Sequence, residues 1–217
     1  YAHCTPITYN ISYNLNNGTH GSSHPTSATY DNSVNISNPT KKITVNLSRG
    51  TTASGATISS TSASANQTFN GWTASNLSTA TAMYGSSSST INTSWSSDTT
   101  KVKNTYFKNL NYISDSTVTL TAKWGQKSIT LPKITKSGYK CGWATSSSAT
   151  TITYASNATY TPNANGNTSV NLYGVCKSNS APSLKVTFKT SAGYSNYCTS
   201  AYTASNGSCT FDSGYYT

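Results

Sequence analysis

Alternation of apolar and small polar residues is the feature that most restricts how this chain can fold. In ITYNISYNL, residues 7–15, every second residue is Ile, Tyr or Leu, and in TVTLTAKW, residues 117–124, Val, Leu, Ala and Trp alternate with Thr and Lys. Successive side chains of a β-strand point to opposite faces, whereas a helix needs a period of 3.6. These stretches predict half-buried strands, and weaker patterns around 34–36 and 43–47 predict two more.

The composition supports a fold made mainly of strands. The 217 residues include 16 Tyr and 4 Trp among many Ser, Thr and Asn, while only 8% of them are charged, against about 25% in an average domain. Disordered chains are usually poor in aromatic and β-branched residues. No stretch shows sustained helical periodicity. We therefore expect a mainly β protein of small tandem modules with long Ser/Thr-rich loops, and a helical content under about a fifth.

One short motif occurs twice. NQTFNGWTAS, residues 66–75, and SGYKCGWATS, residues 137–146, each hold a Gly-Trp pair at the end of an apolar patch. The first copy is followed by STVTLTAKWG, residues 116–125, and the second by TSVNLYGVCK, residues 168–177. The repetition indicates two related units. The second copy lacks the Asn-Gly turn that follows the first strand of the chain.

The order of these motifs resembles the Listeria–Bacteroides repeat, also called the internalin B-repeat. The stretches that carry the resemblance are ISYNLNNGT (11–19), ATYDNSVNI (28–36), TFNGWTAS (68–75) and TVTLTAKW (117–124). The resemblance implies a β-grasp unit with insertions over residues 1–125 and a shortened second repeat over 126–180. Residues 181–217 match no part of the repeat, and their alternation predicts the start of a third β unit.

Proteins with such repeats are secreted or attached to bacterial surfaces, and the repeat has no catalytic residues. The resemblance therefore implies a non-catalytic adhesin or stalk segment that mediates attachment outside the cell. The alternative is a pilin-like structural subunit of an extracellular filament. A surface with few charges and many tyrosines favours that alternative, because neighbouring copies would repel each other little. No run approaches the ~20 apolar residues that span a bilayer.

Residues that could carry catalysis or bind a metal are few. The four acidic residues are scattered Asp, whereas glycoside hydrolysis normally uses a pair of carboxylates. No Gly-x-Ser-x-Gly nucleophile motif is present. His3, His20 and His24 lie near the start, but the last two enclose a Gly and precede Pro25, which does not favour a metal site. We expect no enzyme activity, no metal and no cofactor.

The cysteines predict disulfide bonds. When the two copies are aligned, Cys141 and Cys176 occupy the positions that hold Asn and Trp in the first copy. Two residues that become Cys together indicate neighbours in the fold, and their bond would contribute about 3–4 kcal/mol by closing the loop between them. Cys198 and Cys209 flank an Asn-Gly turn and should close a hairpin, which leaves Cys4 free or paired outside this chain. Disulfides imply an oxidising, extracytoplasmic setting.

The positive charge indicates anionic partners. Fourteen Lys and Arg against four acids give a formal charge of +10, which favours anionic cell-surface polymers or glycans. Other copies of the chain are the alternative partner, and one Arg without a nucleic-acid motif argues against a nucleic-acid reader. We expect Trp72, Trp124 and Trp143 in a core and Trp95 exposed as a possible binding aromatic. The candidate contacts to an anionic surface are Lys101, Lys103, Lys108, Lys127, Lys133 and Lys136.

Overall fold

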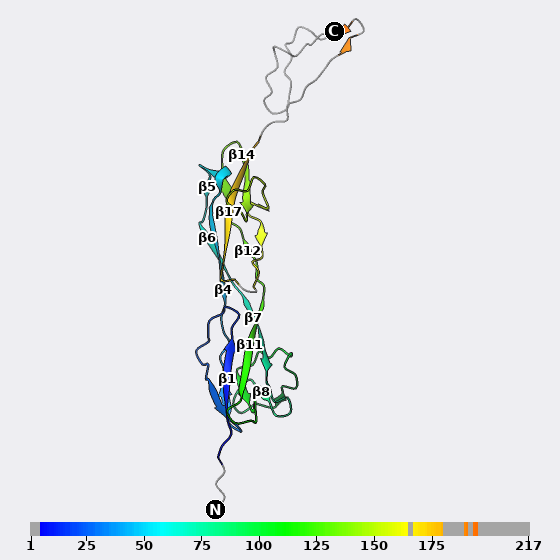
Figure 1. Ribbon diagram of the computed structural model, residues 1–217. Coiled ribbons are helices and arrows are strands. Elements are labelled where there is room, and N and C mark those ends of the chain that lie inside the picture. Colours follow the sequence, from blue (N-terminus) through cyan, green and yellow to red (C-terminus); the bar gives the residue numbers. More distant parts are fainter. Residues whose placement is uncertain (1–4, 165–166, 180–188, 191–192, 195–217) are drawn as a thin grey trace, which may run out of the picture.

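The computed structural model describes residues 5–164, 167–179, 189–190 and 193–194, and Figure 1 shows their arrangement. Strands make up 46% of the structure and helix 2%. The helical part of these residues is one 3-10 turn, η1, at Thr51–Ala53. The prediction of a mainly β protein with little helix is confirmed.

The first unit packs two four-stranded sheets around one core. One sheet has the order β2-β1-β11-β7 and the other β3-β10-β8-β9. Their bounds are β1 Thr8–Asn14, β2 Ser27–Thr29, β3 Ser33–Asn35, β7 Thr68–Ser75, β8 Met83–Gly85, β9 Thr93–Ser94, β10 Tyr106–Lys108 and β11 Thr117–Gly125. The core joins inward residues of both sheets, such as Ile11 and Leu120 from one and Phe107 from the other. The apolar residues of the predicted alternation in β1 and β11 therefore lie on the faces of these strands that pack in the core.

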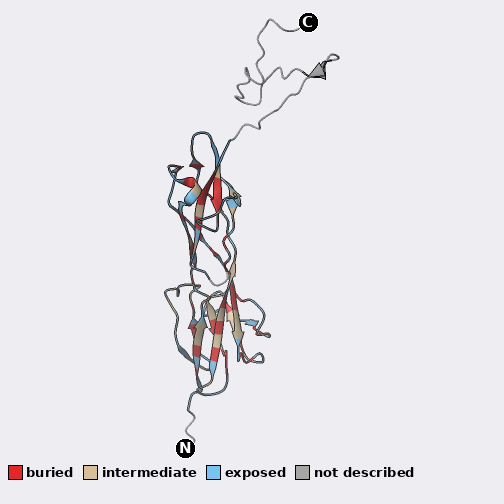
Figure 2. Cartoon of the chain, turned by 45° about the horizontal axis from the view of Figure 1, so that its top comes forward, coloured by how far each residue is buried: buried red, intermediate tan, exposed pale blue. Residues whose placement is uncertain are grey.

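The second unit is built on one five-stranded sheet of order β15-β14-β17-β4-β6. These strands are β4 Lys42–Arg49, β6 Ser62–Asn66, β14 Tyr139–Ala144, β15 Tyr154–Ala155 and β17 Ser169–Ser178. Two short pairs complete it: β12 Ile129–Thr130 with β16 Thr159–Tyr160, and β13 Ile134–Thr135 with β5 Thr57–Ile58. Its separate core contains Val45, Leu47, Trp143 and Leu172. Figure 2 shows buried residues gathered in each unit.

The two units are interleaved along the chain, which corrects the predicted division at residue 125. Strands β4, β5 and β6 lie within residues 42–66. Yet β4 pairs with β17 and β5 with β13 of the second unit, and β6 extends that sheet by pairing with β4. The first unit therefore consists of residues 5–40 and 67–125, and the second of 41–66 and 126–179. Strand patterns along the sequence do not reveal this arrangement, because they do not specify which core a strand joins.

Both units follow the same plan. In the first, β1 runs parallel to the closing strand β11, which pairs antiparallel with the Gly-Trp strand β7. In the second, β4 runs parallel to β17, which pairs antiparallel with β14. The second copy is thus not shortened at its start as predicted. Its opening strand is β4, which lies inside the first copy.

The Gly of each Gly-Trp pair lets another segment cross the strand closely. A Cβ on Gly71 would lie 2.9 Å from the backbone of Val102, and Gly71 has φ +117°. A Cβ on Gly142 would lie 2.5 Å from the carbonyl oxygen of Tyr154 on β15. The following Trp72 and Trp143 turn into the two cores and are at most 1% exposed. The motif repeats because each unit needs a close crossing next to a large core residue.

The predicted disulfide between Cys141 and Cys176 is confirmed. The two residues are direct partners on β14 and β17, and their sulfurs are bonded at 2.05 Å. In the first unit the equivalent place holds a β-bulge, where the pairing shifts between Lys123 and Trp124. The predicted roles of Cys4, Cys198 and Cys209 lie outside the described residues. So does most of the predicted third unit, apart from the pair β18 Lys189–Thr190 and β19 Gly193–Tyr194.

Trp95 is buried, so the prediction of an exposed binding aromatic is wrong. Its side chain is 0% exposed and packs on Phe107, with ring centroids 5.7 Å apart. Its indole N–H donates to the carbonyl oxygen of Thr100 at 3.2 Å, and its backbone N–H donates to Ala82. The Ser-rich segment around it folds back over the first core. Trp124, predicted as core, is partly buried against that core.

Candidate functional site

Two of the three described acidic residues, Asp31 and Asp115, make polar contacts within the first unit. Within the described residues, no group of three His, Cys, Asp or Glu could hold a metal ion. Asp31 forms an ion pair with Lys108 at 3.4 Å and accepts a hydrogen bond from Asn109 at 3.2 Å. Asp115 donates its backbone N–H to Thr8. Lys108 is therefore partly neutralised, although an exposed pair of this kind contributes little stability.

The described histidines serve aromatic packing. The rings of His20 and His24 stack with centroids 4.3 Å apart, and His20 meets the ring of Tyr13 edge-on at 5.2 Å. Burial, and secondarily the neighbouring His24, lower the pKa of His20 below its ordinary value. His3 lies outside the described residues.

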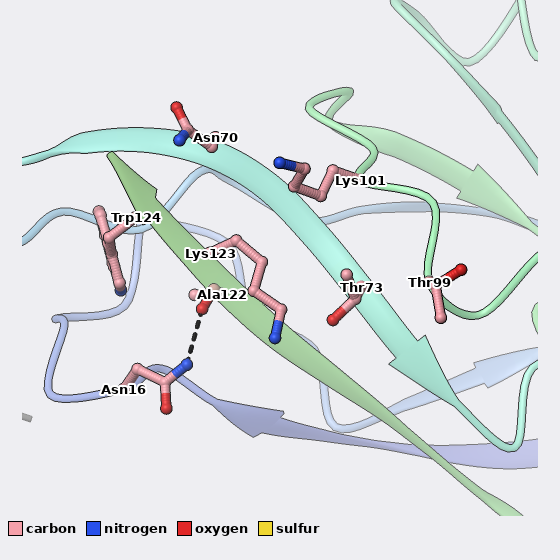
Figure 3. Close-up of a pocket in the computed structure, with 8 residues that line it drawn as sticks. All are labelled: Asn16, Asn70, Thr73, Thr99, Lys101, Ala122, Lys123 and Trp124. Carbon is pink, nitrogen blue, oxygen red and sulfur yellow. Dashed lines mark hydrogen bonds between the residues drawn. The ribbon is translucent and has the colours of Figure 1, made fainter. Parts of the chain in front are cut away.

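A polar concavity with a volume of about 410 Å³ lies on the first unit near its junction with the second. Figure 3 shows its lining residues: Asn16, Asn70, Thr73, Thr99, Lys101, Ala122, Lys123 and Trp124. Alternation along β11 buries Ala122 and turns Lys123 outward. The turn after β1 contributes Asn16, whose side-chain amide donates to the carbonyl oxygen of Ala122 at 2.8 Å. Four segments distant in sequence thus meet in this concavity, which we call the lysine concavity.

The lining of the lysine concavity is chemically suited to an anionic, hydroxyl-rich ligand. Its lining has two ammonium groups, two side-chain amides and two hydroxyls, but no carboxylate. Ammonium groups attract carboxylate, sulfate or phosphate groups, and amides and hydroxyls can both donate and accept hydrogen bonds. Trp124 adds a partly exposed indole, which is held in place because its N–H donates to the carbonyl oxygen of Leu15 at 2.9 Å. An acidic sugar has groups that can pair with each of these side chains.

Of the six lysines predicted as anion contacts, Lys101 alone lines the lysine concavity. Lys108 is paired with Asp31. Lys136 lies over the ring of Tyr139 in the second unit, with its nitrogen 4.2 Å from the ring centroid. The remaining three, Lys103, Lys127 and Lys133, are exposed and do not line the concavity. Lys123 was not predicted, although its outward place in an alternating strand was a usable signal.

Lys41 is a buried cation at the junction of the two units. Its side chain is 3% exposed, and its ammonium donates to the carbonyl oxygen of Asn16 in the first unit at 2.6 Å. It also donates to the carbonyl oxygen of Ala164 in the second unit. Burial lowers the pKa of Lys41. In the sequence it is indistinguishable from the exposed Lys42 beside it.

Comparison with known proteins identifies no relative of this chain. No protein-family model, curated protein or solved structure matches this chain. Among the described residues, no helix is long and apolar enough to cross a membrane.

Proposed function

We propose that this chain is a non-catalytic module of a bacterial surface or secreted protein that attaches to anionic polymers or glycans. The lysine concavity supports this proposal best, since Lys101 and Lys123 line it among amides and hydroxyls, and no carboxylate is part of its lining. The motif order that resembles the internalin B-repeat supports the same class of protein and a β-grasp relationship for each unit. A charge of +10 on the whole chain adds attraction toward polyanions.

The disulfide supports an extracytoplasmic location. Cys141 and Cys176 are bonded within the core of the second unit, and Cys176 is only 4% exposed. Disulfides persist in oxidising compartments and are rare in the reducing cytosol. A surface or secreted module accounts for this bond and for the cationic concavity together.

Retention on immobilised heparin or teichoic acid at increasing salt tests the proposal. We expect the chain to bind at low salt and to elute as salt rises, because exposed charges are screened beyond ~10 Å at 0.1 M. A Lys101→Gln/Lys123→Gln variant should elute at distinctly lower salt than the unmodified chain. Failure of the unmodified chain to bind either polymer at low salt would contradict the proposal.

A matched variant separates the concavity from net charge. Lys42→Gln/Lys140→Gln removes the same two charges from exposed places outside the concavity. We expect this variant to elute close to the unmodified chain. If both double variants shift equally, then the concavity contributes no more than any two lysines, and the proposed site is wrong.

A further inference from the structure

The geometry points to a further function: this chain bears tension along its long axis, through one shear-loaded pair of strands in each unit. The two units lie end to end, β1 begins at the outer end of the first, and β17 ends at the outer end of the second (Figure 1). A pull between these two ends therefore runs roughly along the strands. This inference depends on strand topology and not on the lysine concavity.

In the first unit the loaded strands are β1 and β11. They run parallel, with five partner pairs from Asn10↔Thr117 to Asn14↔Thr121. Tension enters β1 at its amino end and leaves β11 at its carboxyl end, so the two strands are pulled in opposite directions along their length. Interstrand hydrogen bonds lie across the strands. They are loaded together, and separating β1 from β11 requires the whole ladder to break at once.

The second unit repeats this geometry with β4 and β17. They also run parallel, with six partner pairs from Thr44↔Ser169 to Arg49↔Gly174. The amino end of β4 is joined to the first unit, and the carboxyl end of β17 points to the outer end of the second. A pull again slides the two strands past each other. The two ladders are therefore loaded one after the other along the same axis.

The junction transmits the pull without a single weak linker. The chain passes between the units near residues 41, 67 and 126, because the units are interleaved. The Lys41 ammonium contacts carbonyl oxygens of both units. The buried Gln67 donates its backbone N–H to the carbonyl oxygen of Lys41. Its side-chain oxygen accepts a hydrogen bond from the backbone N–H of Lys127 at 3.2 Å. Separating the units would break these contacts as well as a ladder.

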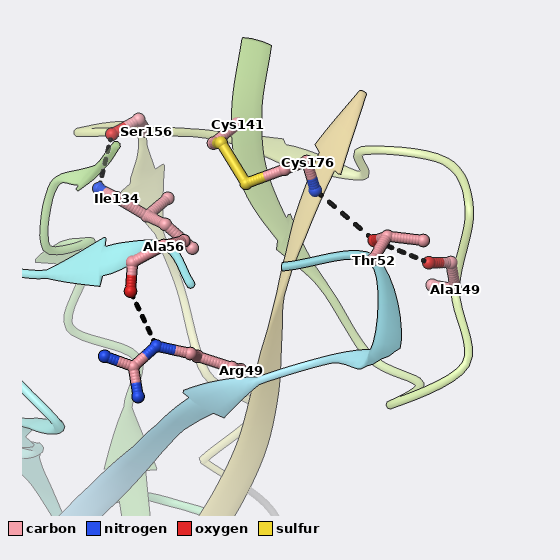
Figure 4. Close-up of a disulfide and its surroundings, with 8 residues drawn as sticks. All are labelled: Arg49, Thr52, Ala56, Ile134, Cys141, Ala149, Ser156 and Cys176. Carbon is pink, nitrogen blue, oxygen red and sulfur yellow. Dashed lines mark hydrogen bonds between the residues drawn. A yellow bond between two sulfur atoms is a disulfide. The ribbon is translucent and has the colours of Figure 1, made fainter. Parts of the chain in front are cut away.

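The disulfide limits how far the second unit can extend. Cys176 lies two residues before the end of β17 and is bonded to Cys141 on β14, as Figure 4 shows. A pull on the end of β17 therefore reaches β14 through a covalent bond. The 35-residue separation between the two cysteines stays out of the line of force while the bond is intact. At 3.3–3.6 Å per residue, that segment is roughly 120 Å of extended chain.

Single-molecule pulling on the full chain tests this inference in two directions. In the first arm the handles are at the two chain ends. In the second arm, one handle is at the amino terminus and the other at the exposed Ser114. Ser114 lies near the start of β1, because the backbone N–H of the next residue, Asp115, donates to the carbonyl oxygen of Thr8. The second arm peels β1 from β11 one pair at a time. We expect the unfolding force in the first arm to be at least about twice that in the second, because forced unfolding reports a barrier along the pull and not equilibrium stability.

Removing this one disulfide provides an independent measurement in the first arm. Without reductant, the Cys141→Ser/Cys176→Ser variant should give a fully unfolded chain that is longer by roughly 120 Å. Equal unfolding forces in the two arms would overturn the inference of shear-loaded strands. An unchanged unfolded length in the Cys141→Ser/Cys176→Ser variant would overturn the role of the disulfide as a limit on extension.

Discussion

At the residue scale, two neighbouring lysines have opposite environments. Lys41 is 3% exposed between carbonyl oxygens of both units, whereas Lys42 begins β4 with its side chain in solvent. Desolvation lowers the pKa of Lys41 from its ordinary value of 10.5. Because the unfolded chain then holds the proton more tightly, the contribution of Lys41 to stability rises as pH climbs from the lowered pKa towards 10.5. The two hydrogen bonds of the Lys41 ammonium offset the free-energy cost of burying its charge.

We expect Lys41→Ala to lower the free energy of unfolding by about 2–3 kcal/mol, because two buried carbonyl oxygens lose a charged donor. Lys42→Ala should change it by less than about 0.5 kcal/mol, as exposed substitutions usually do. Urea unfolding of the three proteins at pH 7 measures both values. An equal decrease in the free energy of unfolding in both variants would show that Lys41 does not stabilise the junction.

At the scale of elements, the Gly-Trp strands show how a short motif positions a crossing segment. Trp72 exchanges backbone hydrogen bonds with Val102, whose N–H and carbonyl lie 2.9 and 2.8 Å from their partners. Gly71 leaves the room that this crossing needs, and its φ of +117° is one that L side chains rarely adopt. Gly138, by contrast, has φ +74° and no heavy atom within 4 Å of its Cβ position. A side chain at either glycine would strain the backbone, but only one at Gly71 would also contact neighbouring atoms closely.

Gly138→Ala should lower the free energy of unfolding by about 1 kcal/mol, the cost of a left-handed backbone for a residue with Cβ. Gly71→Ala adds a contact with backbone atoms that cannot rotate away, and we expect a loss of about 3 kcal/mol or more. Thermal or urea unfolding measures the difference. A Gly71→Ala variant as stable as Gly138→Ala would mean that the Val102 segment is free to move.

At the scale of the whole molecule, interleaving makes the units depend on segments distant in sequence. The second core takes Val45, Leu47 and Ala53 from the first half of the chain. The sheet of residues 126–179 alone would lack β4 and β6, and half of β17 would lose its partner. Few apolar contacts would then remain to offset the conformational entropy of ordering the segment.

A fragment of residues 126–180 should therefore stay unfolded, although sequence motifs suggest that it is a repeat. Joining residues 41–66 to it through a flexible linker should restore a folded unit with the Cys141–Cys176 bond. Circular dichroism and the dispersion of amide NMR signals measure folding, and non-reducing peptide mapping identifies the bond. A folded 126–180 fragment would contradict the interleaved arrangement.

The sequence alone determined the local structure of this protein and its one described disulfide. Alternation over 7–15 and 117–124 predicted β1 and β11 because one face of each strand is buried, and the aligned Gly-Trp copies predicted the neighbours Cys141 and Cys176. Tertiary structure decided the rest. A strand pattern shows which face is buried but not which core receives it, so the place of β4, the burial of Trp95 and Lys41, and the meeting of Lys101 with Lys123 required the folded chain.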